Sequence, residues 1–205
     1  MEAFNQLSAI AAPLDAENMD TDQILPVRFL RNPRENGYAQ YLFHDLRFEK
    51  DGAEKPDFIL NQPPFRKARI LVVASNFGCG SSREQAVFGL LDFGVRAVVG
   101  PGFGDIFFDN CFKNGILPIR TSSAVAAAWR SALHDSPEAK ISIDLAKQKM
   151  AGPDGTSQVF QVDPFRKRCL LEGLDELALT LTHLKAVSDF ESRYRAENSW
   201  LQSSP

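Results

Sequence analysis

The stretch with the greatest chemical content is residues 76–84, which read Asn-Phe-Gly-Cys-Gly-Ser-Ser-Arg-Glu. Gly78 and Gly80 permit a tight turn, and backbone N–H groups at the start of a helix stabilise negative charge in front of them. Arg83 adds a planar, permanently charged guanidinium that can bind a carboxylate through two parallel hydrogen bonds. The pattern therefore indicates carboxylate recognition beside a serine hydroxyl that could lose its proton.

Two plainer interpretations of the same stretch stay open from the residues alone. One is an ordinary helix cap followed by a surface arginine. The other is a phosphate-binding loop, but the stretch lacks the Gly-Lys-Ser/Thr ending that such a loop requires.

The elements on either side explain how this turn would be positioned. Residues 70–74 form a continuous apolar run, typical of a strand buried on both faces. After the turn, Ser81 or Ser82 is predicted to cap a helix that carries apolar residues at three- and four-residue spacing and ends at Gly94. A second unit follows, with a strand at 97–99, a glycine-rich turn at 100–104, a helix from 105 that stops before 115, and a strand at 117–119. Two such units predict right-handed crossovers in a parallel sheet.

The flanking segments are less regular. We predict a strand over residues 4–14, an irregular exposed segment over 23–34, a short helix around 41–48 and a breaker-rich linker over 52–64. Ser122 or Ser123 should cap a helix through Trp129, and 141–145 and 158–162 should be antiparallel strands around a turn at 152–155. Asp163 should cap a helix with proline at its first position. A last helix over 186–195 should fray into a disordered tail over 196–205.

Composition limits the class of protein. The chain has 205 residues, 44% of them hydrophobic and 24% charged, with a formal net charge of −3, as expected for one globular domain spanning 1–205. This charge gives no reason to expect nucleic acid or an anionic membrane as a partner. No apolar run reaches the roughly 18 residues of a membrane-spanning helix, and residues 1–14 lack a basic leader segment, so we expect a cytoplasmic protein.

Cysteine and histidine residues are scattered along the chain. Cys79, Cys111 and Cys169 are separated by 31 and 57 intervening residues, which suits neither a disulfide framework nor an iron–sulfur cluster. We predict reduced thiols, with Cys79 and Cys111 as small buried residues. The three histidines, at 44, 134 and 183, have no paired carboxylate motif and are predicted to play surface or satisfied polar roles rather than to bind zinc.

Taken together, the motifs resemble a known family. Residues 76–84 resemble the swivel-domain signature of the aconitase superfamily, and the whole chain is similar to the small subunits of isopropylmalate dehydratases. Residues 18–26 are similar to the family's N-terminal Asp-Thr-Asp loop. Residues 103–107 with 110–118, and 174–181, match two further motifs. The resemblance implies an α/β swivelling β/β/α domain, with a central mostly parallel sheet flanked by helices and additional antiparallel strands.

The resemblance also assigns roles. Ser81 matches the catalytic base, while Ser82 and Arg83 match neighbours that bind substrate carboxylate. The base would take a proton from the carbon next to a carboxylate, and a metal would draw off hydroxide from the adjacent carbon. Readdition of water with the opposite regiochemistry would convert 2-isopropylmalate into 3-isopropylmalate. This chain lacks cluster ligands, and the resemblance implies a separate large subunit that carries the 4Fe-4S cluster. The implied enzyme is a hydro-lyase of leucine biosynthesis whose small subunit binds no metal and is inactive alone.

Two loops complete the predicted site. The residues predicted to support the serine turn are Asp20, Thr21, Asp22, Asn76, Gly78 and Gly80. Asp20 and Asp22 form too small a ligand set for a hard cation, and we expect them to accept backbone hydrogen bonds instead. Arg28, Leu30 and Arg31 occupy the place of the family's substrate-specificity loop, where an apolar side chain beside a cation would suit a branched alkyl group next to a carboxylate.

One departure keeps alternatives open. Gln85 stands where small subunits usually have histidine, so homoaconitate or another 2-alkylmalate remains an alternative substrate. A stand-alone module that binds a carboxylate or phosphate at the glycine-rich turns is a second alternative, and a purely structural or regulatory partner is a third.

Overall fold

The computed structural model describes residues 1–81, 83–198 and 200 of the 205-residue chain. In this part of the chain, seven strands form one mixed sheet in the order β4-β3-β2-β1-β5-β6-β7. The strands are β1 (Gln6–Leu14), β2 (Ile70–Val73), β3 (Ala97–Gly100), β4 (Leu117–Arg120), β5 (Lys140–Asp144), β6 (Lys149–Ala151) and β7 (Ser157–Val159). β1 to β4 run parallel, and β5 to β7 add an antiparallel half. The predicted mixed α/β architecture is confirmed.

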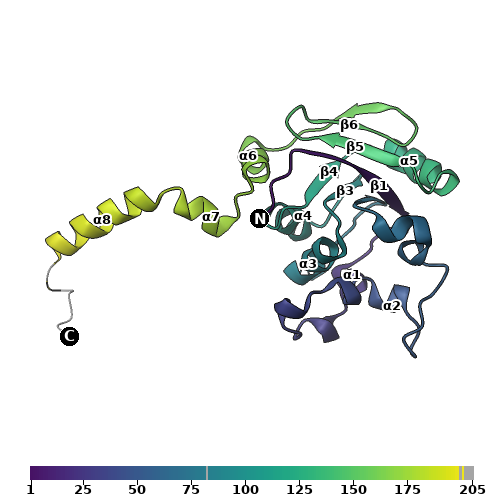
Figure 1. Cartoon of the computed structure of the whole chain (residues 1–205), viewed down its shortest axis with the longest axis horizontal. Coiled ribbons are helices and arrows are strands. Elements are labelled where there is room, and N and C mark those ends of the chain that lie inside the picture. Colours follow the sequence, from purple (N-terminus) through teal and green to yellow (C-terminus); the bar gives the residue numbers. More distant parts are fainter. Residues whose placement is uncertain (82, 199, 201–205) are drawn as a thin grey trace.

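Helices cover both faces of the sheet (Figure 1). They are α1 (Thr21–Ile24), α2 (His44–Arg47), α3 (Glu84–Phe93), α4 (Asp105–Lys113), α5 (Ser123–Asp135), α6 (Pro164–Glu172), α7 (Glu176–Leu181) and α8 (Leu184–Glu197). Short 3₁₀ turns at Val27–Phe29, Arg34–Asn36, Ala39–Tyr41, Ile59–Asn61 and Pro63–Lys67 fill the long connection between α1 and β2. No helix in the described part of the chain is both long enough and apolar enough to cross a membrane.

Strand β2 shows why the sheet is buried on both faces. Leu71 and Val73 pack into a core with α3 and α4, whereas Ile70 and Val72 pack into a second core with α5. The alternation follows from the two-residue period of a strand. Trp129 of α5 is almost fully buried in the second core. The apolar run that predicted this strand is thus explained by burial on both sides.

Several boundaries differ from those predicted. Ser122 caps α5, as one of the two predicted candidates, but the helix continues past Trp129 to Asp135. The prediction that strands at 141–145 and 158–162 pair directly with each other is wrong. Residues 149–151 form a further strand, β6, which pairs with both β5 and β7. Within the segment predicted to be exposed, Ile24 and Leu25 are buried in the first core. The predicted helix around 41–48 is a 3₁₀ turn followed by α2.

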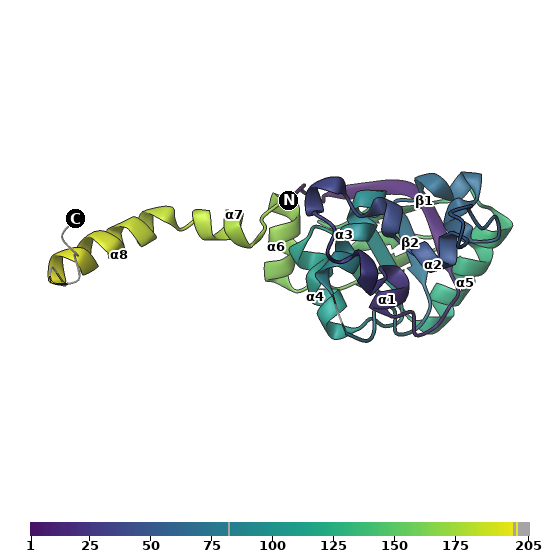
Figure 2. The same cartoon turned by 90° about the horizontal axis from the view of Figure 1, so that it is seen from below.

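The C-terminal part leaves the body of the molecule. Asp163 accepts hydrogen bonds from the Phe165 and Arg166 N–H groups, which confirms the predicted cap of α6. Beyond α6, helices α7 and α8 extend away from the sheet in both views of the chain (Figure 1 and Figure 2). α8 continues to Glu197, so the first two residues of the predicted tail are helical. Positions 199 and 201–205 of that tail lie outside the described residues.

Candidate active site

The serine turn lies at the carboxyl end of β2, between two neighbouring loops. On one side, Phe77 N donates to Gly102 O at 3.2 Å and Gly104 N donates to Phe77 O at 2.9 Å. On the other side, Gly78 N donates to Met19 O at 2.7 Å. The backbone of the turn is therefore tied to the carboxyl-end loops of both adjacent strands, β1 and β3. In an open parallel sheet, this edge is where ligands bind.

Close packing fixes the shape of the turn. Gly78 has a φ of +71°, and a Cβ there would lie 2.2 Å from Cγ of the buried Phe107. Gly104 lies close to the backbone of the turn, because a Cβ added at Gly104 would lie 2.4 Å from Gly78 O. Asn76, with a φ of +60°, donates from Nδ2 to Asn18 Oδ1 at 2.9 Å. No side chain larger than hydrogen fits at positions 78 and 104 without moving these neighbours.

The N-terminal loop supports the turn through backbone and side chain. Thr21 is buried, and its N–H donates to Cys79 O at 3.1 Å, while its Oγ1 lies 3.4 Å from Ser81 O. Asp20 caps α1, since its Oδ1 accepts from Gln23 N at 2.8 Å and its own N–H donates to Gln23 Oε1. These contacts hold the Asp-Thr-Asp loop against the serine turn.

Arg83 is bound by the third residue of the same loop. Its Nη1 forms an ion pair with Asp22 Oδ1, and the Arg83 side chain keeps 24% of its surface exposed. Asp22 thus meets a guanidinium, rather than the backbone N–H groups that the sequence led us to expect. The pair joins residues 61 positions apart, and sequence spacing gives no signal for such a contact.

The start of α3 differs from the prediction. The helix begins at Glu84, and its N-cap is Arg83, whose backbone is extended and whose side chain makes no capping bond. Ser81 therefore does not cap the helix. Ser82, predicted as the other candidate cap and as a carboxylate-binding residue, lies outside the described residues.

Ser81 itself is exposed to solvent. Its backbone is fixed by the turn, and the half-buried Arg83 lies two residues further along the chain. Ser81 and Arg83, which both reach solvent, follow the carboxyl end of β2, and we call this place the serine corner. Such a corner can bind a carboxylate, but a serine alkoxide needs a less aqueous, charge-stabilising setting to form at neutral pH.

The three residues of the predicted specificity loop occupy different environments. Arg28 donates from Nη1 to Asp45 Oδ2 at 2.9 Å and lies over the Phe29 ring. The Arg28 hydrogen bond lowers the pKa of Asp45 despite an opposing effect of burial. Leu30 is half-buried against the first core, and Arg31 is exposed. Arg28 also reaches solvent, so the two arginines differ in that Arg28 is paired with Asp45.

Metal-binding groups are dispersed. Among the described residues, no group of three or more His, Cys, Asp or Glu side chains lies close enough to hold a metal ion. Cys111 is fully buried, which raises the pKa of its thiol well above the ordinary value. Cys79 and Cys169 are half-buried free thiols, so Cys79 is less buried than predicted. The residues present do not fit an iron–sulfur cluster, which needs several converging thiolates.

A polar cluster that the sequence did not reveal lies at the end of β1. The Asp15 carboxylate accepts from Arg130 Nε at 2.8 Å and contacts His134 Nε2 at 2.6 Å. Arg130 also donates to Val73 O at 3.0 Å, which links the cluster to the strand that leads into the serine turn. His134 thus has the satisfied polar role predicted for the histidines. Its partner Asp15 is 119 positions away, a contact without a sequence signature.

Comparison with known proteins identifies relatives over nearly the whole chain. The model of the aconitase C-terminal domain family matches residues 1–124. A 3-isopropylmalate dehydratase small subunit from Nitrobacter hamburgensis is 48% identical over 98% of this chain and 100% of its own length. Similar proteins of that name from Rhodospirillum centenum and Paramagnetospirillum magneticum are 48% and 47% identical, each over 98% of this chain.

A solved structure shares the fold. The crystal structure of a 3-isopropylmalate dehydratase protein from Methanocaldococcus jannaschii superposes with a TM-score of 0.62 and covers 92% of this chain and 98% of its own. The two sequences are 22% identical, so this similarity concerns the fold alone.

Proposed function

Because this chain belongs to the family of 3-isopropylmalate dehydratase small subunits, we propose that it interconverts 2-isopropylmalate and 3-isopropylmalate as one half of a two-subunit hydro-lyase of leucine biosynthesis. The observation that carries this proposal is the open corner formed by Ser81 and Arg83. An exposed hydroxyl on a rigid turn stands there with a guanidinium two residues away. A base and a carboxylate-binding cation are two of the groups that dehydration next to a carboxylate requires.

In this proposal Ser81 is the base that removes the proton from the carbon beside a carboxylate of the substrate. Arg83 binds that carboxylate through its guanidinium, and Ser82 contributes a second contact. The Asp22 ion pair engages Nη1 of Arg83 and orients the guanidinium before substrate arrives. The isomerisation is completed when a proton is added to the carbon that had carried the hydroxyl and hydroxide is added to the carbon that had lost its proton.

The chemistry at the hydroxyl-bearing carbon falls to a 4Fe-4S cluster on the large subunit. Two features of this chain support such a division of labour. The described residues bring together no set of cluster ligands, and Ser81 is exposed when the chain is alone. A large subunit that covers the corner would exclude water from Ser81, so that charge-stabilising groups act more strongly on it.

The test is reconstitution of the enzyme with its large subunit and comparison of Ser81→Ala with Arg83→Lys on 2-isopropylmalate. A positioned base contributes roughly 100- to 10,000-fold to rate, so Ser81→Ala should lower kcat by at least about 100-fold. Arg83→Lys keeps the charge but loses the planar fork, and KM should rise by about ten-fold or more. Unchanged kinetics in both variants would support a purely structural role instead.

Homoaconitate provides the second arm of this experiment, because Gln85 replaces the usual histidine in the first turn of α3. We expect kcat/KM to be higher for 2-isopropylmalate than for homoaconitate. The reverse order would identify a related hydro-lyase. Activity of the chain without any large subunit would contradict the two-subunit proposal.

A further inference from the structure

Helices α7 and α8 form an arm, residues 176–198, that extends away from the body of the protein (Figure 1). Neither helix contains a buried residue. Large apolar side chains of the arm are nevertheless numerous, and each of the following is at least 41% exposed: Leu177, Leu181, Leu184, Val187, Phe190 and Tyr194. An isolated helix of 14 residues is marginal in water, so this arm needs a partner to be stable.

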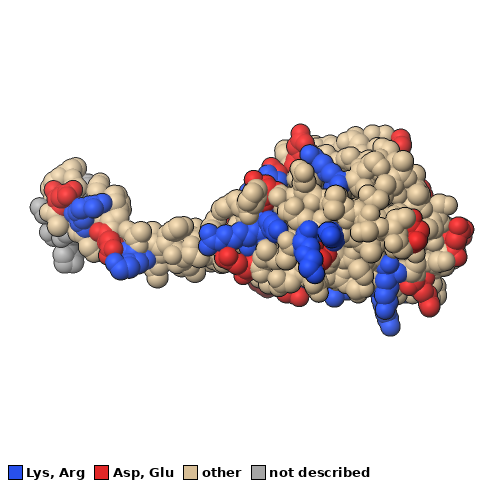
Figure 3. Space-filling view, turned by 90° about the horizontal axis from the view of Figure 1, so that it is seen from above, with Lys and Arg blue, Asp and Glu red and all other residues tan. Residues whose placement is uncertain are grey.

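The arm is two-sided. In α8 the apolar residues Leu184, Val187, Phe190 and Tyr194 follow at spacings of three, three and four, which places them along one side of the helix. Phe190 and Tyr194 stack at 5.7 Å. Lys185 and Asp189 form an ion pair at 2.9 Å on the other side. In the space-filling view, charged side chains gather along α8, and an uncharged stretch joins the arm to the body (Figure 3).

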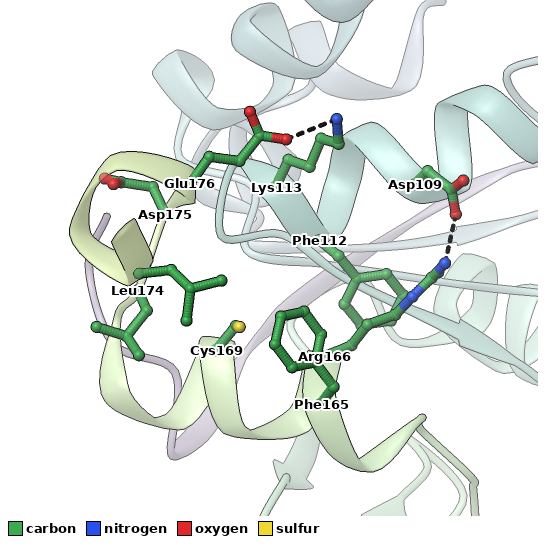
Figure 4. A pocket seen from close by; sticks show the side chains of 10 residues that line it. Asp109, Phe112, Lys113, Phe165, Arg166, Cys169, Leu174, Asp175 and Glu176 are labelled. Carbon is green, nitrogen blue, oxygen red and sulfur yellow. Dashed lines mark ion pairs between the residues drawn. The ribbon is translucent and has the colours of Figure 1, made fainter. Parts of the chain in front are cut away.

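An apolar groove lies at the root of the arm, between α4, α6 and α7. Its volume is about 320 Å³, and Phe112, Phe165, Cys169 and Leu174 line it. Phe165 is 56% exposed. Two ion pairs, Lys113 with Glu176 and Arg166 with Asp109, flank the groove (Figure 4). The groove therefore extends the apolar surface of the arm onto the body.

The same surface adjoins the candidate active site. Glu84, the first residue of α3 and the neighbour of Arg83, accepts a hydrogen bond from Asn114 Nδ2 at 2.9 Å. Lys113 then pairs with Glu176 at the start of α7. One shared hollow is lined by residues of α3, the end of α4 and the start of α7, among them Glu84, Lys113, Asn114, Glu176 and Leu177. The root of the arm thus adjoins Glu84, the residue that directly follows Arg83 of the serine corner.

We propose that the arm and the groove at its root dock onto the large subunit, so that one interface runs from the serine corner along α7 and α8. This proposal rests on the proposed function, because it takes the large subunit as the partner that covers Ser81. Continuity favours that partner over a second copy of this chain, because a protein seated on Ser81 and Arg83 would next reach Glu84 and the start of α7, which line one hollow. Its complementary surface must be apolar, to receive the side chains of α8.

The test is the affinity of the full chain for the large subunit, measured by titration calorimetry for the double variant Phe190→Ser and Tyr194→Ser. Phe, Tyr and Ser have similar helix propensities, so the change removes apolar surface without weakening the helix itself. The matched control is Lys185→Ser with Asp189→Ser, which places two serines on the polar side and leaves the net charge unchanged. We expect at least ten-fold weaker binding for the apolar double variant and less than a two-fold change for the control.

Activity separates this proposal from the proposed function. With the large subunit in saturating excess, the apolar double variant should keep the kcat of the wild-type enzyme, because Ser81 and Arg83 are untouched. Equal affinities for wild type and both variants would overturn the docking proposal while leaving the proposed function standing. A wild-type chain that neither binds nor activates the large subunit would instead overturn the proposed function.

Hydrogen exchange gives an independent measurement that does not depend on variants. Amides of residues 184–197 should exchange rapidly in the isolated chain and become protected when the large subunit is added. Protection of the serine corner without protection of α8 would overturn the proposal. A wild-type dimer that the apolar double variant abolishes, with no loss of affinity for the large subunit, would assign the arm to a second copy.

Discussion

The Arg83 guanidinium and the Asp22 carboxylate form an ion pair that joins the serine turn to the N-terminal loop. The pair is partly exposed, with 24% of the Arg83 side chain and 51% of the Asp22 side chain accessible to solvent. It engages one terminal nitrogen of the guanidinium, and a substrate carboxylate can approach the exposed side. We therefore propose that Asp22 positions Arg83 rather than contacting substrate.

Substituting Asp22 should affect substrate binding more than turnover. An exposed ion pair contributes roughly 0.2–1 kcal/mol, so Asp22→Asn should raise KM by about five-fold at most and leave kcat nearly unchanged. Asp22→Glu keeps a carboxylate within reach of Arg83 and should recover most of the loss. Steady-state kinetics of the reconstituted enzyme checks this, and a large fall in kcat with constant KM would contradict a positioning role.

The specificity loop offers a matched pair of arginines. Both side chains reach solvent, but Arg28 is paired with Asp45 and lies over the Phe29 ring. Arg31→Ala should therefore raise KM for 2-isopropylmalate by several-fold more than Arg28→Ala, since only the free guanidinium is available to a carboxylate. Substrate titrations of both variants, assembled with the large subunit, measure the difference. The opposite order would show that substrate displaces Asp45 from Arg28.

The parallel half of the fold was predictable from local sequence. Strands β2, β3 and β4 are short apolar runs that end at glycine-rich or polar turns. Such continuous apolar runs indicate strands that are buried on both faces. Strand β6 was missed because it has three residues, of which only Met150 is buried. This strand is stabilised by pairing with β5 and β7 on either side, and a pattern in one sequence does not indicate such pairing.

Part of the site was predictable for the same reason. The turn around Ser81 depends on Gly78 and Gly80, which lie close together in sequence, and its motif could therefore be recognised. The Asp22 partner of Arg83 and the Asp15 cluster depend on residues brought together from distant elements. The cap of α3 was predicted wrongly, because the helix begins at Glu84 with Arg83 as its N-cap, although serine is the residue that favours this position locally.

Gly78 is the position where the turn should be most sensitive. Alanine there would have a φ of +71° and a Cβ 2.2 Å from Phe107, whereas alanine at Gly155 would have a similar φ of +77° with open space around it. The left-handed conformation costs alanine roughly 1–2 kcal/mol at either site, and overpacking adds about 1–3 kcal/mol at Gly78. Urea unfolding should show Gly78→Ala to be less stable than Gly155→Ala by at least about 1 kcal/mol. Equal stabilities would mean that Phe107 moves aside without cost.

The Asp15 cluster should make stability depend on pH in the acidic range. Burial alone would raise the pKa of Asp15, but hydrogen bonds from His134 and Arg130 outweigh it and hold the pKa below its ordinary value of 3.8. The unfolded chain therefore binds more protons than the folded chain in this range, and stability falls as pH falls. The contribution is complete above the unfolded value and is lost as pH drops through the folded pKa.

Asp15→Asn should accordingly reduce the free energy of unfolding at pH 6, and its deficit relative to wild type should shrink between pH 4 and pH 2, which urea titrations at each pH can measure. His134→Gln removes one of the two hydrogen bonds that lower the pKa of Asp15. In that background the deficit caused by Asp15→Asn should vary less with pH, because the folded and unfolded pKa values lie closer together. A deficit that stays constant from pH 6 to pH 2 would show that the Asp15 carboxylate is not held by these two partners.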